Sequence, residues 1–190
     1  MLVKSRNRYV NGKILNIDRF NLSRRSGFLY GLSKWQKELG VLRMAQLGAS
    51  LKIFTSHRVI YGDTDQMGVV YYANYLRWFE KGRSEFLRQI GLPYKTIEAQ
   101  GFHFPVTEVS CRYFKSAHYD DLITIATQLT SVGRASLTFD YIISREGDTS
   151  SLASGSTKHA CVDVDGRITR IPGDLTQRLA KVLITPTQLT

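Results

Sequence analysis

One long amphipathic helix, predicted over residues 74–90, constrains the fold of this chain more than any other feature of its sequence. Its apolar face is formed by residues four, three, four and four positions apart: Tyr75, Phe79, Gly82, Phe86 and Ile90. Asn74 is the predicted N-cap, and Gly91-Leu92-Pro93 is a typical helix end. Such a helix is stable only when its apolar face is buried against another element.

The partner of this helix is predicted to be a sheet, because the segments around it have strand patterns. One strand is predicted before the helix, over residues 53–61, and four after it, over 104–115, 122–131, 135–145 and 152–164. We therefore predict an α+β fold in which a five-stranded antiparallel sheet curls around the helix. Gly82 costs the helix about 1 kcal/mol relative to alanine, so we expect it to mark a close approach to the sheet. A short final helix is predicted near residues 173–183.

The net charge of +10 is concentrated in the first 52 residues. Residues 1–52 contain 11 Lys and Arg against two acids, whereas residues 53–190 contain 15 Lys and Arg against 14 acids. The two segments therefore carry charges of +9 and +1. A surface for nucleic acid would have to lie in residues 1–52, and we predict no nucleic-acid partner for the rest of the chain.

We divide the chain into a basic N-terminal extension, residues 1–52, and a folded domain, residues 53–190. Residues 1–27 are polar and aperiodic, which predicts disorder, and residues 28–47 have apolar side chains at helical spacing. Three explanations of the extension remain open. The first is that the extension is upstream sequence read from a misplaced start, with Met44 as the first residue of the domain. The second is that it is a transit peptide. The third is that it is an arm that contacts a membrane or a partner.

Several classes of protein are disfavoured by what the sequence lacks. No apolar run approaches the ~20 residues of a membrane span, and there is no Walker loop, dinucleotide-binding fingerprint or Cys/His metal spacing. We therefore predict no transmembrane segment, no cofactor and no metal. Cys111 and Cys161 fall within predicted strands, which favours a reduced, cytoplasmic protein, while organelle targeting by residues 1–43 stays open.

Acyl-transfer chemistry is suggested by the segment between the first strand and the helix. It reads Tyr61-Gly62-Asp63-Thr64-Asp65-Gln66-Met67-Gly68-Val69-Val70-Tyr71-Tyr72. A carboxylate on a loop before a helix N-terminus suits acyl transfer, because the helix end supplies N–H donors for a carbonyl oxygen and the carboxylate supplies a nucleophile or base. From spacing alone, Asp65 is equally well explained as a turn residue before the helix.

The same residues resemble those of a known family. The run from Tyr61 through Asp63, Asp65 and Gly68 to Tyr71, followed by Asn74-Tyr75-Leu76 and Trp78-Phe79-Glu80, is similar to that of the 4-hydroxybenzoyl-CoA thioesterase family, especially its YbgC-type acyl-CoA thioesterases. The segment Tyr119-Asp120-Asp121-Leu122 resembles the turn before that family's third strand. The resemblance covers residues 53–183, and it implies the hotdog fold, thioester hydrolysis, and homodimers or homotetramers.

The resemblance also assigns catalytic residues. Asp65 corresponds to the family's catalytic carboxylate, and Tyr61 to an active-site tyrosine of YbgC-type members. Many of those members have a histidine where this chain has Tyr72, so the role of that histidine does not transfer. At this position the benzoyl-CoA enzymes use a backbone N–H at the helix start to polarise the thioester carbonyl. A basic cluster that holds CoA phosphates in those enzymes is reduced here to Arg134.

Four further residues of the motif are predicted to contact the substrate: Gly68, Val69, Tyr71 and Tyr75. Gly68 either gives the backbone room beside the thioester or simply makes a turn. The two tyrosines line an acyl pocket or belong to the core.

The remaining polar residues have structural explanations. Asp63 is expected to be a turn former that binds loop amides. Glu80, one turn into the helix, is expected to form a salt bridge or a subunit contact. The histidines are expected on the surface or on strand faces rather than as bases: His57, His103, His118 and His159.

We therefore predict an acyl-CoA thioesterase whose aspartate carboxylate acts as nucleophile or general base. Acyl-carrier protein is a second candidate carrier of the acyl group. The alternative function is a non-catalytic hotdog module that binds acyl chains or acyl-carrier protein. The intact Asp65 favours hydrolysis, and the sequence does not specify the acyl group.

Overall fold

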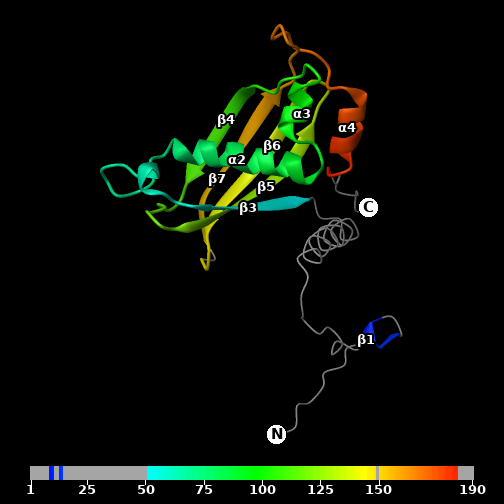
Figure 1. Ribbon diagram of the computed structural model, residues 1–190. Coiled ribbons are helices and arrows are strands. Elements are labelled where there is room, and N and C mark those ends of the chain that lie inside the picture. The colour runs from blue at the N-terminus through cyan, green and yellow to red at the C-terminus, as the bar shows by residue number, and fades with distance from the viewer. Residues whose placement is uncertain (1–8, 11–12, 15–50, 149, 184–190) are drawn as a thin grey trace, which may run out of the picture. The chain divides into compact units, whose positions relative to one another are not determined.

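The computed structural model describes residues 9–10, 13–14, 51–148 and 150–183 (Figure 1). Strands β1 (Tyr9–Val10) and β2 (Lys13–Ile14) pair antiparallel within the segment predicted to be disordered. The rest of that segment and the helix predicted over residues 28–47 lie outside the described residues. The boundary between the extension and the domain stays a prediction.

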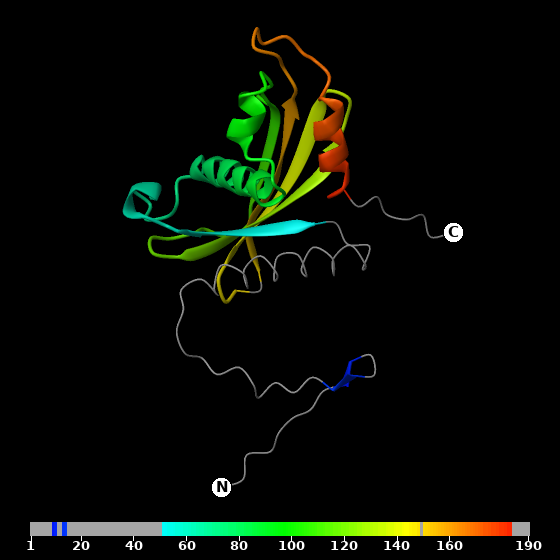
Figure 2. The ribbon, with the colours of Figure 1, turned by 45° about the vertical axis from the view of Figure 1, so that its right-hand side comes forward.

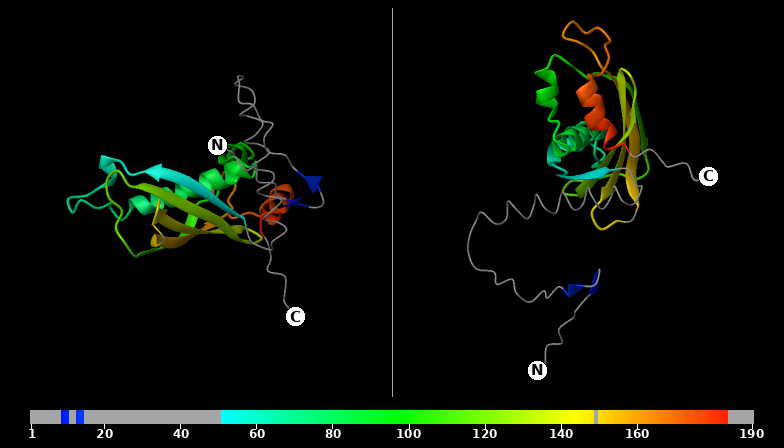
Figure 3. Two further views of the ribbon diagram at one scale, coloured as in Figure 1. Left: turned by 90° about the horizontal axis from the view of Figure 1, so that it is seen from below. Right: turned by 90° about the vertical axis from the view of Figure 1, so that its right-hand side faces the viewer.

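A five-stranded antiparallel sheet forms the body of residues 51–183, as predicted. Its spatial order is β3-β5-β6-β7-β4. The strands have these bounds: β3 (Lys52–Arg58), β4 (Val106–Tyr113), β5 (Leu122–Val132), β6 (Ser136–Arg145) and β7 (Ser151–Ala160). The long helix α2 (Asn74–Gln89) runs across one face of this sheet, which curves around it (Figure 3). The prediction of a sheet curled around one helix is confirmed.

The core lies between α2 and the sheet. Phe79 and Tyr141 are at most 1% exposed and stack with their ring centroids 4.4 Å apart, while Phe86 meets Phe139 edge to face at 5.7 Å. The predicted close approach at Gly82 is confirmed, because a Cβ there would lie 2.3 Å from Thr127 Oγ1. Alternating strand residues therefore pack directly against the helix that the sequence pattern predicts.

Two short helices close one end of the sheet. The helix α3 (Tyr94–Glu98) follows the Gly91 turn, which has a φ of +78°, and was not predicted. The helix α4 (Gly173–Ala180) fits the predicted final helix. The loop between β3 and α2 lies at the opposite end of the sheet from α4 (Figure 2).

Two boundaries near this loop differ from the prediction. Strand β3 ends at Arg58 rather than Tyr61, and the 3₁₀ turn η2 (Tyr61–Asp63) follows, because the Asp63 carboxylate accepts a hydrogen bond from the Ile60 N–H and turns the chain. Asn74 is not the N-cap: Ala73 occupies that position, and the Asn74 side chain is buried and donates its amide to the Asp63 carbonyl. Both differences come from contacts within the loop.

Candidate active site

The loop between β3 and α2 folds into a tight hairpin that presents Asp65. The Asp65 N–H donates to the Val69 carbonyl at 3.0 Å, and the Gly68 N–H donates to the Asp65 carbonyl at 2.9 Å. Gly68 has a φ of +73°, and a Cβ there would meet nothing within 4 Å, so conformation rather than space calls for glycine. The Val70 N–H donates to Ala117, which ties the hairpin to the segment before β5.

The Asp65 carboxylate combines a turn role with an available oxygen. Its Oδ1 accepts a hydrogen bond from the Met67 N–H at 2.8 Å, which is the Asx turn that the sequence allowed. Among the residues that the structure describes, Oδ2 has no hydrogen-bond partner. The turn therefore orients the carboxylate and leaves one oxygen for chemistry.

Asp63 lies beneath the hairpin and joins three segments. Its carboxylate oxygen Oδ2 accepts from the Ile60 N–H at 3.1 Å and lies 3.1 Å from His57 Nε2. Its main-chain carbonyl accepts from the Tyr71 N–H at 2.9 Å and from Asn74 Nδ2 at 2.8 Å. The expectation that Asp63 binds loop amides is met, and the residue is only 5% exposed.

The start of α2 offers two free N–H groups beside this loop. The N–H groups of Asn74, Tyr75 and Leu76 donate to the carbonyls three residues before them. For the N–H groups of Tyr72 and Ala73, the described part of the chain contains no acceptor. Free N–H groups at a helix N-terminus bind anionic or partly negative oxygens well.

Aromatic side chains surround the helix start. The rings of Tyr71 and Tyr72 lie 4.5 Å apart, and hydrogen bonding to Tyr72 raises the pKa of Tyr71. Tyr75 is buried, its hydroxyl accepts from the Ala117 N–H, and burial raises its pKa. The Tyr113 hydroxyl, whose pKa is also raised by burial, donates to the Tyr72 carbonyl at 3.1 Å. The raised pKa values of Tyr71, Tyr75 and Tyr113 keep these three hydroxyls neutral at pH 7, so they do not act as bases.

Two predicted site residues lie away from this cluster. Tyr61 is 79% exposed and packs its ring against Tyr119, so it is a surface residue and not part of the core. Arg134 lies in the turn after β5, at the end of the sheet that contacts Ile171. The 11 residues of β5 place it about 30 Å from the hairpin. Within one chain the structure does not bring Arg134 to Asp65.

Glu80 and the histidines have defined positions. Glu80 is exposed and borders a hollow of about 330 Å³ beside His57 and Lys81, and the described residues give it no ion pair. His159 lies on a strand face, as expected, but that face is the core, and the side chain is 0% exposed. His159 follows Ala153, Gly155 and Thr157 at two-residue spacing along β7. This spacing could have predicted that its side chain faces the core.

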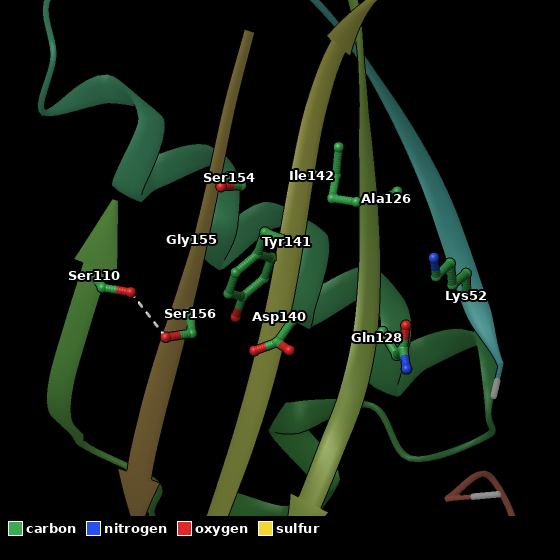
Figure 4. Close-up of a pocket in the computed structure, with 10 residues that line it drawn as sticks. All are labelled: Lys52, Ser110, Ala126, Gln128, Asp140, Tyr141, Ile142, Ser154, Gly155 and Ser156. Carbon is green, nitrogen blue, oxygen red and sulfur yellow. Dashed lines mark hydrogen bonds between the residues drawn. The ribbon is translucent and has the colours of Figure 1, made fainter. Parts of the chain in front are cut away.

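A second hollow, of about 420 Å³, lies on the face of the sheet away from α2 (Figure 4). Ser110 and Ser156 share a hydrogen bond of 2.9 Å there, and burial raises the pKa of the nearby Asp140. The hollow is built from strand side chains and does not include the hairpin. Nowhere in the described ranges do three potential metal ligands gather, and no described helix is long and apolar enough to cross a membrane.

Comparisons with known proteins address the same region. A family model described as the thioesterase-like superfamily matches residues 59–179. The acyl-CoA thioesterase YbgC of Haemophilus influenzae is 38% identical over 108 residues, which are 56% of this chain and 78% of that protein. The crystal structure of a hypothetical protein from Thermus thermophilus is 36% identical, with a TM-score of 0.67, and covers 71% of this chain and 100% of its own. A mutant 4-hydroxybenzoyl-CoA thioesterase, crystallised with 4-hydroxybenzoyl-CoA, is 26% identical, with a TM-score of 0.62, and covers 67% of this chain and 98% of its own.

Proposed function

The chain belongs to the thioesterase-like superfamily and is a thioester hydrolase with the hotdog fold, and on that premise we propose that Asp65 acts on the carbonyl of an acyl-CoA. The observation that carries this proposal is that one Asp65 carboxylate oxygen and two N–H groups at the adjacent helix start all lack partners among the residues that the structure describes. The carboxylate supplies the nucleophile or base, and the N–H groups stabilise negative charge on the carbonyl oxygen.

Two routes are open to the Asp65 carboxylate. In the first, Oδ2 attacks the thioester carbon, the C–S bond breaks, CoA leaves as a thiolate, and water then hydrolyses the mixed anhydride and restores Asp65. In the second, the carboxylate takes a proton from water while the water oxygen attacks the same carbon, the C–S bond breaks, and the departing CoA thiolate takes that proton and restores Asp65. In both, the N–H groups of Tyr72 and Ala73 bind the carbonyl oxygen. A thiolate is a good leaving group, so neither route needs a strong general acid.

Substrate contacts follow from the geometry around the hairpin. In this proposal Tyr71, Gly68 and Val69 border the position of the thioester, and the exposed Tyr61 serves as a flanking contact to the substrate. Tyr75 is 2% exposed and belongs to the core, which was the alternative explanation of this residue. Arg134, about 30 Å away along β5, contacts a CoA bound at Asp65 only from a second copy of the chain.

A homodimer or homotetramer is supported by the edge of the sheet. The edge strand β4 leaves Val106 and Val109 50% exposed and Tyr113 44% exposed. An apolar strand edge without a neighbour favours pairing with a second copy. The two free cysteines fit a reducing compartment, and we assign the protein to the cytoplasm.

A hydrolysis screen tests this function. The full chain is incubated with aliphatic, benzoyl and naphthoyl CoA thioesters and with acyl-carrier protein thioesters, and thiol release is measured with a chromogenic disulfide. We expect turnover of at least one CoA thioester. Binding of these thioesters without any thiol release would favour the non-catalytic acyl-binding module instead.

A further inference from the structure

The two free N–H groups at the start of α2 point outward because the carbonyls of their peptides are held. In a trans peptide the C=O and N–H point in opposite directions. The Tyr71 carbonyl accepts from the Asn74 N–H at 2.9 Å, so the Tyr72 N–H of the same peptide is directed away from the helix. The Tyr72 carbonyl accepts from the Tyr113 hydroxyl and from the Tyr75 N–H, which directs the Ala73 N–H in the same way.

Asn74 closes a ring of hydrogen bonds around this segment. Its N–H holds the Tyr71 carbonyl, its side-chain Nδ2 holds the Asp63 carbonyl at 2.8 Å, and that carbonyl also accepts from the Tyr71 N–H at 2.9 Å. Asn74 is 9% exposed, and its Oδ1 lies 3.4 Å from Arg77 Nη1. A side chain that capped the helix would accept from a later N–H, whereas Asn74 donates backward into the loop.

Asp63 is two residues from Asp65, so this ring connects the carboxylate loop to the N–H donors. We propose that Asn74 is a positioning residue that sets the separation between the Asp65 carboxylate and the free N–H groups of Tyr72 and Ala73. The inference rests on the proposed function. Its physical basis is that a displacement of about 1 Å between reacting groups can cost about 100-fold in rate.

The test compares the full-length Asn74→Ala and Asn74→Asp variants with Ile97→Val, a core change on α3 at the far end of α2. Alanine removes the donor, and aspartate keeps the shape of the side chain but replaces the donor by an acceptor. We expect both Asn74 variants to lower kcat by about 10- to 100-fold with little change in KM, and Ile97→Val to leave both constants near wild type.

Amide hydrogen exchange, followed by NMR on the same proteins, gives a readout that does not depend on activity. The Tyr71 N–H should exchange about 10-fold faster in Asn74→Ala, because its acceptor is no longer fixed, and should be unchanged in Ile97→Val. If Asn74→Asp fails to fold, Asn74→Ala alone decides the comparison.

The outcomes separate the two proposals. Wild-type kcat in a folded Asn74→Ala variant overturns the positioning role, and so does an equal loss of kcat in Ile97→Val. If the wild-type chain hydrolyses none of the thioesters tested, the proposed function fails, and the exchange rate of Tyr71 then decides the inference: an unchanged rate in Asn74→Ala overturns it.

Discussion

The buried imidazole of His159 should make the stability of the fold depend on pH. The side chain is 0% exposed, its Nδ1 lies 3.0 Å from the Phe104 carbonyl, and its Nε2 lies 3.1 Å from Arg83 Nη1. These contacts suit a neutral ring that donates from Nδ1 and accepts at Nε2. Burial, and then the positive charge of Arg83, lower the pKa of His159 from 6.5 to about 4.

The sign and size of the effect follow from this pKa. As pH falls below 6.5, the unfolded chain binds a proton that the folded protein does not, so stability is lost down to the folded pKa of about 4. A shift of one pKa unit corresponds to about 1.4 kcal/mol, so the full loss is about 3 kcal/mol, of which about 2 kcal/mol falls between pH 7 and pH 5.

Urea unfolding of wild type and His159→Gln at pH 7, 6 and 5, at one protein concentration, measures this loss. Glutamine keeps a hydrogen-bond acceptor but does not titrate, so other acid-sensitive groups cancel when the two proteins are compared. The stability advantage of wild type over the variant should shrink by about 2 kcal/mol from pH 7 to pH 5. An advantage that stays constant over this range would refute the reasoning.

Three further predictions concern packing, the loop and the sheet edge. Gly82→Ala should destabilise the fold by about 1–3 kcal/mol in thermal unfolding, because the new Cβ would lie 2.3 Å from Thr127 Oγ1; a more stable variant would show that the helix moves freely. Asp63→Asn should lower stability by about 1–2 kcal/mol with kcat nearly unchanged, because the main-chain carbonyl that holds Tyr71 and Asn74 remains; a large loss of kcat at wild-type stability would contradict this. Val109→Lys on the β4 edge should give a monomer by light scattering, and an unchanged oligomer would place the interface elsewhere.

The fold could be predicted because the informative patterns are long and regular. The predicted helix over residues 74–90 matches α2 to within one residue, since its apolar face repeats over four turns and Gly91 ends it. In β5 and β6 every second residue is predicted to face the core, because these residues alternate along the strand. The structure buries them. Gly82, which costs helix propensity, correctly marked a close approach of the helix to the sheet.

The details of the candidate site depend on individual side-chain and backbone contacts that the pattern of residue types does not reveal. Nothing local distinguishes the end of β3 at Arg58 from a strand that continues to Tyr61, because the turn is made by the Asp63 carboxylate. Asn74 matches an N-cap in sequence, yet the loop folds back and takes its amide. The free N–H groups at the helix start belong to the backbone, so no residue type in the sequence indicates them. The distance of Arg134, by contrast, could have been predicted from the length of the strand before it.

The most direct test of the central claim is the turnover of Asp65→Asn on a CoA thioester that the wild type hydrolyses. The substitution keeps the shape and the turn of residue 65 but removes the charge. Turnover should fall by about 100- to 10,000-fold, mainly in kcat because the carboxylate acts on the transition state. The control variant Glu80→Gln should lose far less turnover. Circular dichroism checks that both variants are folded. If Asp65→Asn retains near wild-type kcat and Glu80→Gln abolishes it, the catalytic carboxylate lies on α2 and the assignment to Asp65 is wrong.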